Sequence, residues 1–180
     1  GIMTSSMSVT ANFTEVSQGF TFREDGEGYS NGAHPDGWDI FDGHESGTIQ
    51  VSTAVKKVGN ASIAVTRDNL IYKILPHTFT GDVSISVWMF PTPDHNTNNS
   101  FRLGHTNTGD SVWMHVNESH RWWFRSDQLI ADYSGTWTLV EVHINTISGI
   151  VDISLDGVEV VTNAVVNLPQ GINRVGMHSG

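Results

Sequence analysis

The chain has 180 residues, 38% hydrophobic and 16% charged, a balance that suits a globular domain with a real core rather than a disordered chain. Its formal net charge is −10, and a field of that sign disfavours nucleic acid and anionic membrane surfaces as partners. The absence of cysteine excludes disulfides, thiol catalysis and thiolate metal sites. We also find no apolar run of about 18 residues, so we expect no membrane insertion.

Taken in chain order, many segments have the alternation and the β-branched and aromatic content of strands. They are 20–23, 48–52, 61–66, 70–74, 83–90, 100–105, 111–116, 122–125, 139–145, 150–155, 158–162 and 174–178. Asp156-Gly157 is the strongest hairpin signal between them. No segment keeps a helical apolar period for long. We therefore predict an all-β chain that forms an antiparallel β-sandwich or jelly roll.

The domain organisation is predicted to be simple. Residues 1–11 lack the basic and apolar regions of a signal peptide, and we expect a disordered or tag-like N-terminus there. A single jelly-roll domain over 12–180 follows, because no linker-like stretch divides the rest. The polar loop at 91–100 is expected to be a surface excursion.

Four stretches resemble, in the expected order, the concanavalin A-like (laminin-G-like) jelly rolls. They are PDGW at 35–38, VGNASIAV at 58–65, VSISVWMFP at 83–91, and 137–160 with its Asp-Gly turn. The resemblance covers roughly 12–178 and implies a concanavalin A-like jelly roll with one curved, ligand-bearing sheet. The chain departs from the family at its end, because the closing Phe-Asp-Asp strand of many members does not follow 174–178. We therefore expect a missing closing strand or an open sheet edge.

The same resemblance implies a structural Ca²⁺ site, and Ca²⁺ is the one cofactor we consider. Its expected ligands are Asn12, Glu15 and the 58–60 loop with Asn60. Acid-glycine loops such as Asp25-Gly-Glu27 are rich in oxygen ligands, although they are also ordinary turn chemistry. The departure at the end of the chain puts this site in doubt.

Period-two alternation also predicts which side chains face away from the core. In several strands the aliphatic residues take one face, and the opposite face then carries tryptophan, histidine, arginine and other planar polar groups. The residues of this face are Trp88, Arg102, Trp113, His115, Arg121, Trp123, Arg125, Glu141, His143 and Asn145. An indole covers the apolar face of a pyranose while planar polar groups bind its hydroxyls, so we predict a glycan site. In the alternative interpretation, Trp88, Trp113 and Trp123 are core residues, because the second face of the sheet is covered as well.

Three functions remain open from the sequence. The first is a non-catalytic, lectin-like module that binds a polysaccharide or glycan, located outside the cell or on a cell or virion surface. The second is a structural or adhesion domain of a virion, tail fibre or cell-surface assembly that forms a homo-oligomer through an open sheet edge. The third is an atypical polysaccharide lyase or glycoside hydrolase. His115, His143, Arg121 and Arg125 suit it, but the paired carboxylates of a hydrolase strand are absent.

Overall fold

The computed structural model describes residues 11–15, 21–24, 28–40, 48–54, 57, 59, 61–65, 69–91, 98–125 and 127–179. Across these ranges every regular element is a β-strand, as predicted. The strands are β1 (Ala11–Glu15), β2 (Thr21–Glu24), β3 (Trp38–Ile40), β4 (Ile49–Ser52), β5 (Ser62–Val65), β6 (Asn69–Phe79), β7 (Asp82–Met89), β8 (Asn99–His105), β9 (Gly109–Val116), β10 (Arg121–Phe124), β11 (Gln128–Asp132), β12 (Thr138–Asn145), β13 (Ile150–Leu155), β14 (Val158–Val165) and β15 (Ile172–Ser179).

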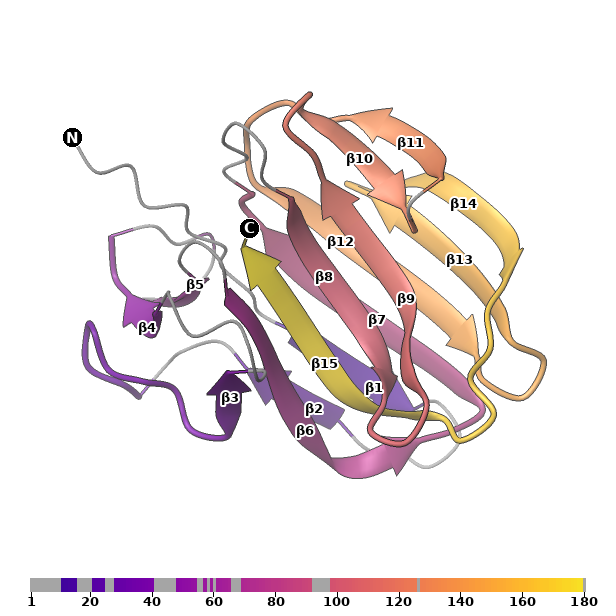
Figure 1. The fold of residues 1–180 in the computed structure, drawn as a ribbon, viewed down its shortest axis with the longest axis horizontal. Helices are drawn as coiled ribbons and strands as arrows, with labels where there is room; N and C mark the ends of the chain where they lie inside the picture. The colour runs from indigo at the N-terminus through magenta and orange to yellow at the C-terminus, as the bar shows by residue number, and fades with distance from the viewer. Residues whose placement is uncertain are drawn as a thin grey trace.

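Two antiparallel sheets lie face to face (Figure 1). Sheet A has the strand order β14-β13-β12-β7-β1-β2, and sheet B has the order β11-β10-β9-β8-β15-β6-β3. A separate hairpin joins β4 to β5. The predicted antiparallel sandwich is therefore confirmed.

The core lies between the two sheets and follows the alternation of the sequence. From sheet A it takes residues such as Ile85 and Val142, and from sheet B residues such as Leu103 and Met114, each at most 2% exposed. One continuous hydrophobic cluster includes side chains of both sheets. The inward positions predicted on 83–90, 100–105, 111–116, 122–125 and 139–145 are all buried. Since a sandwich packs its two inner faces together, the outer faces point in opposite directions.

The structure contains three strands that the sequence did not predict, namely β1, β3 and β11. β1 begins at Ala11, which we had placed in the N-terminal segment; residues 1–10 lie outside the described ranges. β6 is also longer than predicted, because it continues through Pro76 to Phe79. The pairing of β6 with β15 shifts register in this region, where a proline that lacks an N–H is tolerated.

The open edge expected at the C-terminal strand is wrong. β15 lies inside sheet B and pairs with β8 on one side and β6 on the other. The strands at the ends of the two sheet orders are β14 and β2 in sheet A and β11 and β3 in sheet B. Assembly through one of those edges stays a prediction. Within the same ranges no helix is long and apolar enough to cross a membrane.

Candidate functional site

The ten predicted site residues do not share one face. Six lie on or beside sheet B, and these are Arg102, Trp113, His115, Arg121, Trp123 and Arg125. The other four lie on sheet A, and these are Trp88, Glu141, His143 and Asn145. Because the outer faces of the sandwich point away from each other, the single face predicted from the sequence is wrong. Alternation shows which side chains turn away from the core, but not to which sheet a strand belongs.

The four residues on sheet A form local contacts that do not converge on one another. Lys57 Nζ lies 4.6 Å from the ring centroid of Trp88. His143 Nδ1 is 2.9 Å from Ser84 Oγ, and the amide of Asn145 donates to Asp82 Oδ1 at 2.8 Å. His143, Asn145 and their neighbours line a hollow of about 290 Å³. Neither Trp88 nor Glu141 lines it.

On the outer face of sheet B, Trp113, His115 and Trp123 form what we call the aromatic row. The ring centroids of Trp113 and His115 are 5.1 Å apart, and His115 stacks on Trp123 at 6.4 Å with an interplanar angle of 10°. Strand pairing produces this arrangement, because His115 on β9 is opposite Trp123 on β10. His115 is 7% exposed, whereas both tryptophans are half-buried.

Both indole nitrogens and one imidazole nitrogen of the aromatic row are covered. Trp113 Nε1, Trp123 Nε1 and His115 Nδ1 have almost no contact with solvent, and none has a hydrogen-bond partner among the described parts of the chain. The remaining exposure of the two tryptophans therefore belongs to atoms other than the indole nitrogen. The row presents an aromatic surface on the outer face of sheet B.

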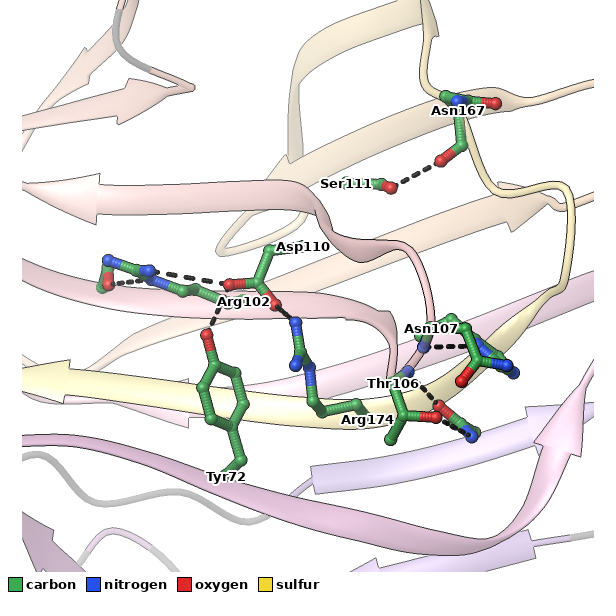
Figure 2. Close-up of polar contacts among 11 residues, drawn as sticks. Tyr72, Arg102, Thr106, Asn107, Asp110, Ser111, Asn167 and Arg174 are labelled. Carbon is green, nitrogen blue, oxygen red and sulfur yellow. Dashed lines mark hydrogen bonds and ion pairs between the residues drawn. The ribbon is translucent and has the colours of Figure 1, made fainter. Parts of the chain in front are cut away.

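Next to the aromatic row lies a group of four residues that we call the guanidinium cluster: Tyr72, Arg102, Asp110 and Arg174 (Figure 2). Tyr72 Oη donates to Asp110 Oδ2 at 2.6 Å, and Arg174 Nη2 donates to Asp110 Oδ1 at 2.8 Å. Arg102 Nη1 lies 3.5 Å from Asp110 Oδ2. The three charged side chains are only 13–19% exposed.

Strand register also links the cluster to the aromatic row. Trp113 on β9 is opposite Arg102 on β8, which is opposite Gly176 on β15, which is opposite Tyr72 on β6. The guanidinium carbon of Arg102 lies 4.9 Å from the ring centroid of Trp113. A Cβ at Gly176 would lie only 2.4 Å from Tyr72 Cε1, so the glycine makes room for the tyrosine ring above β15.

The cluster carries more positive than negative charge. It holds two guanidinium groups and one carboxylate, which leaves a net charge of +1. Burial, and then the hydrogen bond to Asp110, raise the pKa of Tyr72 to about 12, so its hydroxyl stays a donor at neutral pH. Burial, and then the charge of Arg102, lower the pKa of His115, so the imidazole is neutral at pH 7.

Two hollows flank the cluster. One of about 550 Å³ is lined by Thr108, Asp110, Ser111, Arg125 and 165–167, and one of about 170 Å³ is lined by Asp39, Ile40, Tyr72, Ile74 and Arg174. Arg125 lies at the border of the larger hollow, where its guanidinium donates to the carbonyl of Val165. Its backbone N–H donates to the carbonyl of Trp113 at 2.7 Å.

Arg121 is placed differently. It begins β10 two residues before Trp123 and is itself exposed. It pairs with Asp132 at 3.6 Å, and the side chain of Asp132 is 89% exposed. The pair is open to solvent, and such pairs contribute little. We therefore leave Arg121 outside the candidate site.

Sequence reasoning missed Tyr72, Asp110 and Arg174. Tyr72 and Arg174 lie in predicted strands that were not assigned to a face, and Asp110 directly precedes the predicted strand 111–116. The available signal was alternation, since Tyr72 follows the buried Ile71 and Arg174 precedes the buried Val175. The contact between them depends on the strand order of sheet B, which the sequence does not reveal.

The predicted Ca²⁺ site stays a prediction. Asn12 and Glu15 lie in β1, where the structure describes only the backbone, and Asn60 lies outside the described ranges. Among the residues whose side chains are described, no three histidine, aspartate or glutamate residues gather as metal ligands.

No family model and no curated protein matches this chain. A solved structure titled as a sialidase is similar in backbone to 82% of the chain, with a TM-score of 0.43 and 12% sequence identity. The chain spans only 14% of the length of that sialidase. A likeness at this level carries no argument about function.

Proposed function

We propose that the protein is a non-catalytic carbohydrate-binding module of the concanavalin A-like type that acts outside the cell or on a surface. Its glycan binds to the outer face of sheet B, over the aromatic row and beside the guanidinium cluster. The aromatic row is the observation that carries the proposal. Its three rings lie side by side on the face of the sheet that turns away from the core.

A sugar ring has an apolar C–H face and a rim of hydroxyls, so it needs both a flat apolar surface and planar hydrogen-bonding groups. The two indoles supply the first, because their nitrogens are covered while both residues are only half-buried. The guanidinium of Arg102, 4.9 Å from the Trp113 ring, supplies the second.

The platform is held in place before any ligand arrives. Trp113 packs between His115 and Arg102, and Arg102 is fixed in turn by Ser100 Oγ at 3.1 Å and by Asp110. A fixed platform loses little side-chain freedom on binding, which favours affinity. Binding is favoured over catalysis because Asp110 already accepts hydrogen bonds from Tyr72 and Arg174 and forms an ion pair with Arg102, and a carboxylate engaged in this way is a poor general base.

The test compares two tryptophans on opposite faces. A glycan array identifies a ligand, and affinity is then measured for Trp113→Ala and Trp123→Ala. Each is expected to lose about 1–3 kcal/mol, which is a weakening of about 5- to 150-fold.

The matched control is Trp88→Ala, which removes a half-buried indole with its own cation neighbour from sheet A and should retain wild-type affinity. Thermal unfolding confirms that each variant is folded. A ligand whose affinity depends on Trp88 but not on Trp113 or Trp123 would place the site on sheet A and refute the proposal, as would the absence of binding across the array.

A further inference from the structure

The outer face of sheet B gathers positive charge in a chain whose net charge is −10. We propose that the glycan bound there carries carboxylate groups, as uronic acids do, and that Arg102, Arg125 and Arg174 select them. This inference rests on the proposed function and specifies its ligand.

The first argument is the placement of the arginines. The chain has six of them, and Arg102, Arg125 and Arg174 lie around the aromatic row and its neighbouring hollow. Two of them share the single carboxylate of Asp110, while the guanidinium of Arg125 donates to a neutral backbone carbonyl. Around the cluster and its two hollows, three guanidinium groups are opposed by the carboxylates of Asp110 and Asp39, which leaves one positive charge in excess, whereas carboxylates are in excess over the whole chain.

The second argument is burial. With exposures of 13–19%, the two guanidiniums and the carboxylate of the cluster have lost most of their contact with water. Their net charge of +1 is therefore costly in the free protein. Arg174 Nε is covered and has no partner in the part of the chain that the structure describes. The hydroxyls of a neutral sugar would not compensate this charge, whereas a ligand carboxylate would.

The third argument is geometric. Arg102, on β8, is opposite Trp113, on β9. Arg125 follows β10, which pairs with β9 on its other side, and the backbone N–H of Arg125 donates to the carbonyl of Trp113. A pyranose stacked on Trp113 would therefore carry its substituents beside the guanidinium of Arg102, while the guanidinium of Arg125 lies over the ring of Phe124 at the border of the larger hollow. Guanidinium groups match carboxylates in shape as well as in charge. The larger hollow, which Arg125 borders, leaves room beside the row for the next sugar along a chain.

The test uses pairs of ligands that differ only in their charge. Oligogalacturonate, oligomannuronate and hyaluronan oligosaccharides are titrated calorimetrically beside the same molecules with each carboxyl group reduced to a primary alcohol. We expect at least one acidic member to bind about tenfold or more tightly than its reduced partner. This advantage should shrink between about 50 mM and about 500 mM NaCl, because salt screens the attraction.

Variants then identify the arginines that cause the preference for the acidic ligand. Arg102→Gln and Arg125→Gln should each remove much of the preference for the acidic partner, while Arg102→Lys should keep part of it because the charge remains without the planar fork. Arg121→Gln is the matched control, since that exposed arginine lies outside the site, and it should retain the preference. Thermal unfolding reports whether the Arg102 variants are folded, and Arg125→Gln, outside the cluster, provides the test independently of them.

Equal binding of acidic and reduced partners would overturn this inference and leave the proposed function intact. Binding that follows sulfate groups on sulfated glycans and ignores carboxylates would also overturn it. If no glycan of either kind bound, both proposals would fail.

Discussion

Replacing Asp110 by asparagine tests whether the guanidinium cluster is a stabilising unit of the fold. The substitution keeps the size of the side chain and removes the only negative charge between Arg102 and Arg174. Asp110 accepts two short charge-assisted hydrogen bonds, from Tyr72 at 2.6 Å and from Arg174 at 2.8 Å. The amide oxygen of asparagine can still accept one of them, but its NH₂ group would then face a guanidinium.

The magnitude follows from burial. Removing one partner of a buried ion pair costs about 3–5 kcal/mol, and the exposure of 13–19% allows some solvation, which favours the lower end. We expect a loss of about 3 kcal/mol in the free energy of unfolding. For a chain of this length that corresponds to a fall of about 6–12 °C in Tm.

The assay is thermal and urea unfolding followed by tryptophan fluorescence. Asp132→Asn is the control, because Asp132 also pairs with an arginine on sheet B. Its side chain is 89% exposed, whereas that of Asp110 is largely buried. It should change the stability by no more than about 0.5 kcal/mol. If Asp110→Asn shifted Tm no more than Asp132→Asn does, the cluster would not contribute to stability and the reasoning from burial would be refuted.

Three further predictions concern the same face. Gly176→Ala should destabilise the fold by about 1–3 kcal/mol because its Cβ would meet the ring of Tyr72, and urea unfolding should show this cost disappearing in a Tyr72→Ala background. The pKa of His115 is lowered in the folded protein, so the unfolded chain binds more protons just below about pH 6.5 and stability should fall as the pH falls from about 7 to about 5. His115→Gln should flatten this pH dependence in urea unfolding. An unchanged pH dependence would contradict the assignment to His115. The pKa of Tyr72 is raised from 10.0 to about 12, so its contribution to stability is complete below pH 10 and is lost as the pH rises towards 12. Tyr72→Phe should remove the loss of stability that this tyrosine causes at alkaline pH. Ultraviolet titration of the phenolate should then show one late-titrating tyrosine fewer.

The sequence predicted the inward and outward positions of single strands because alternation is a local property. Val83, Ile85 and Val87 on β7 are buried as their spacing indicates. The strands that the sequence did not predict have only a weak local hydrophobic pattern. β3 has three residues, and β11 is an edge strand whose residues are all exposed or half-buried. An edge strand with little to bury does not need a clear hydrophobic pattern.

The candidate site was predictable only in part. Trp113, His115, Trp123 and Arg102 were assigned to an outer face and do lie together, because β8, β9 and β10 follow one another both in the chain and in the sheet. The grouping of Trp88 and His143 with them failed. The contact of Tyr72 with Asp110 joins residues 38 positions apart, on β6 and β9, which are separated in sheet B by β15 and β8. Such a contact depends on the strand order of the whole sheet, so no local sequence pattern predicts it.

The internal position of β15 has a consequence for synthesis on the ribosome. Residues 172–179 leave the ribosome after every other strand of sheet B, yet they separate β6 from β8. Until they emerge, two long strand edges of the nascent chain are unpaired and open to wrong partners, while Arg102 and Asp110 lack Arg174. We therefore expect the hairpin of β8 and β9 to form early, whereas the face proposed to bind a glycan is completed only by this late insertion.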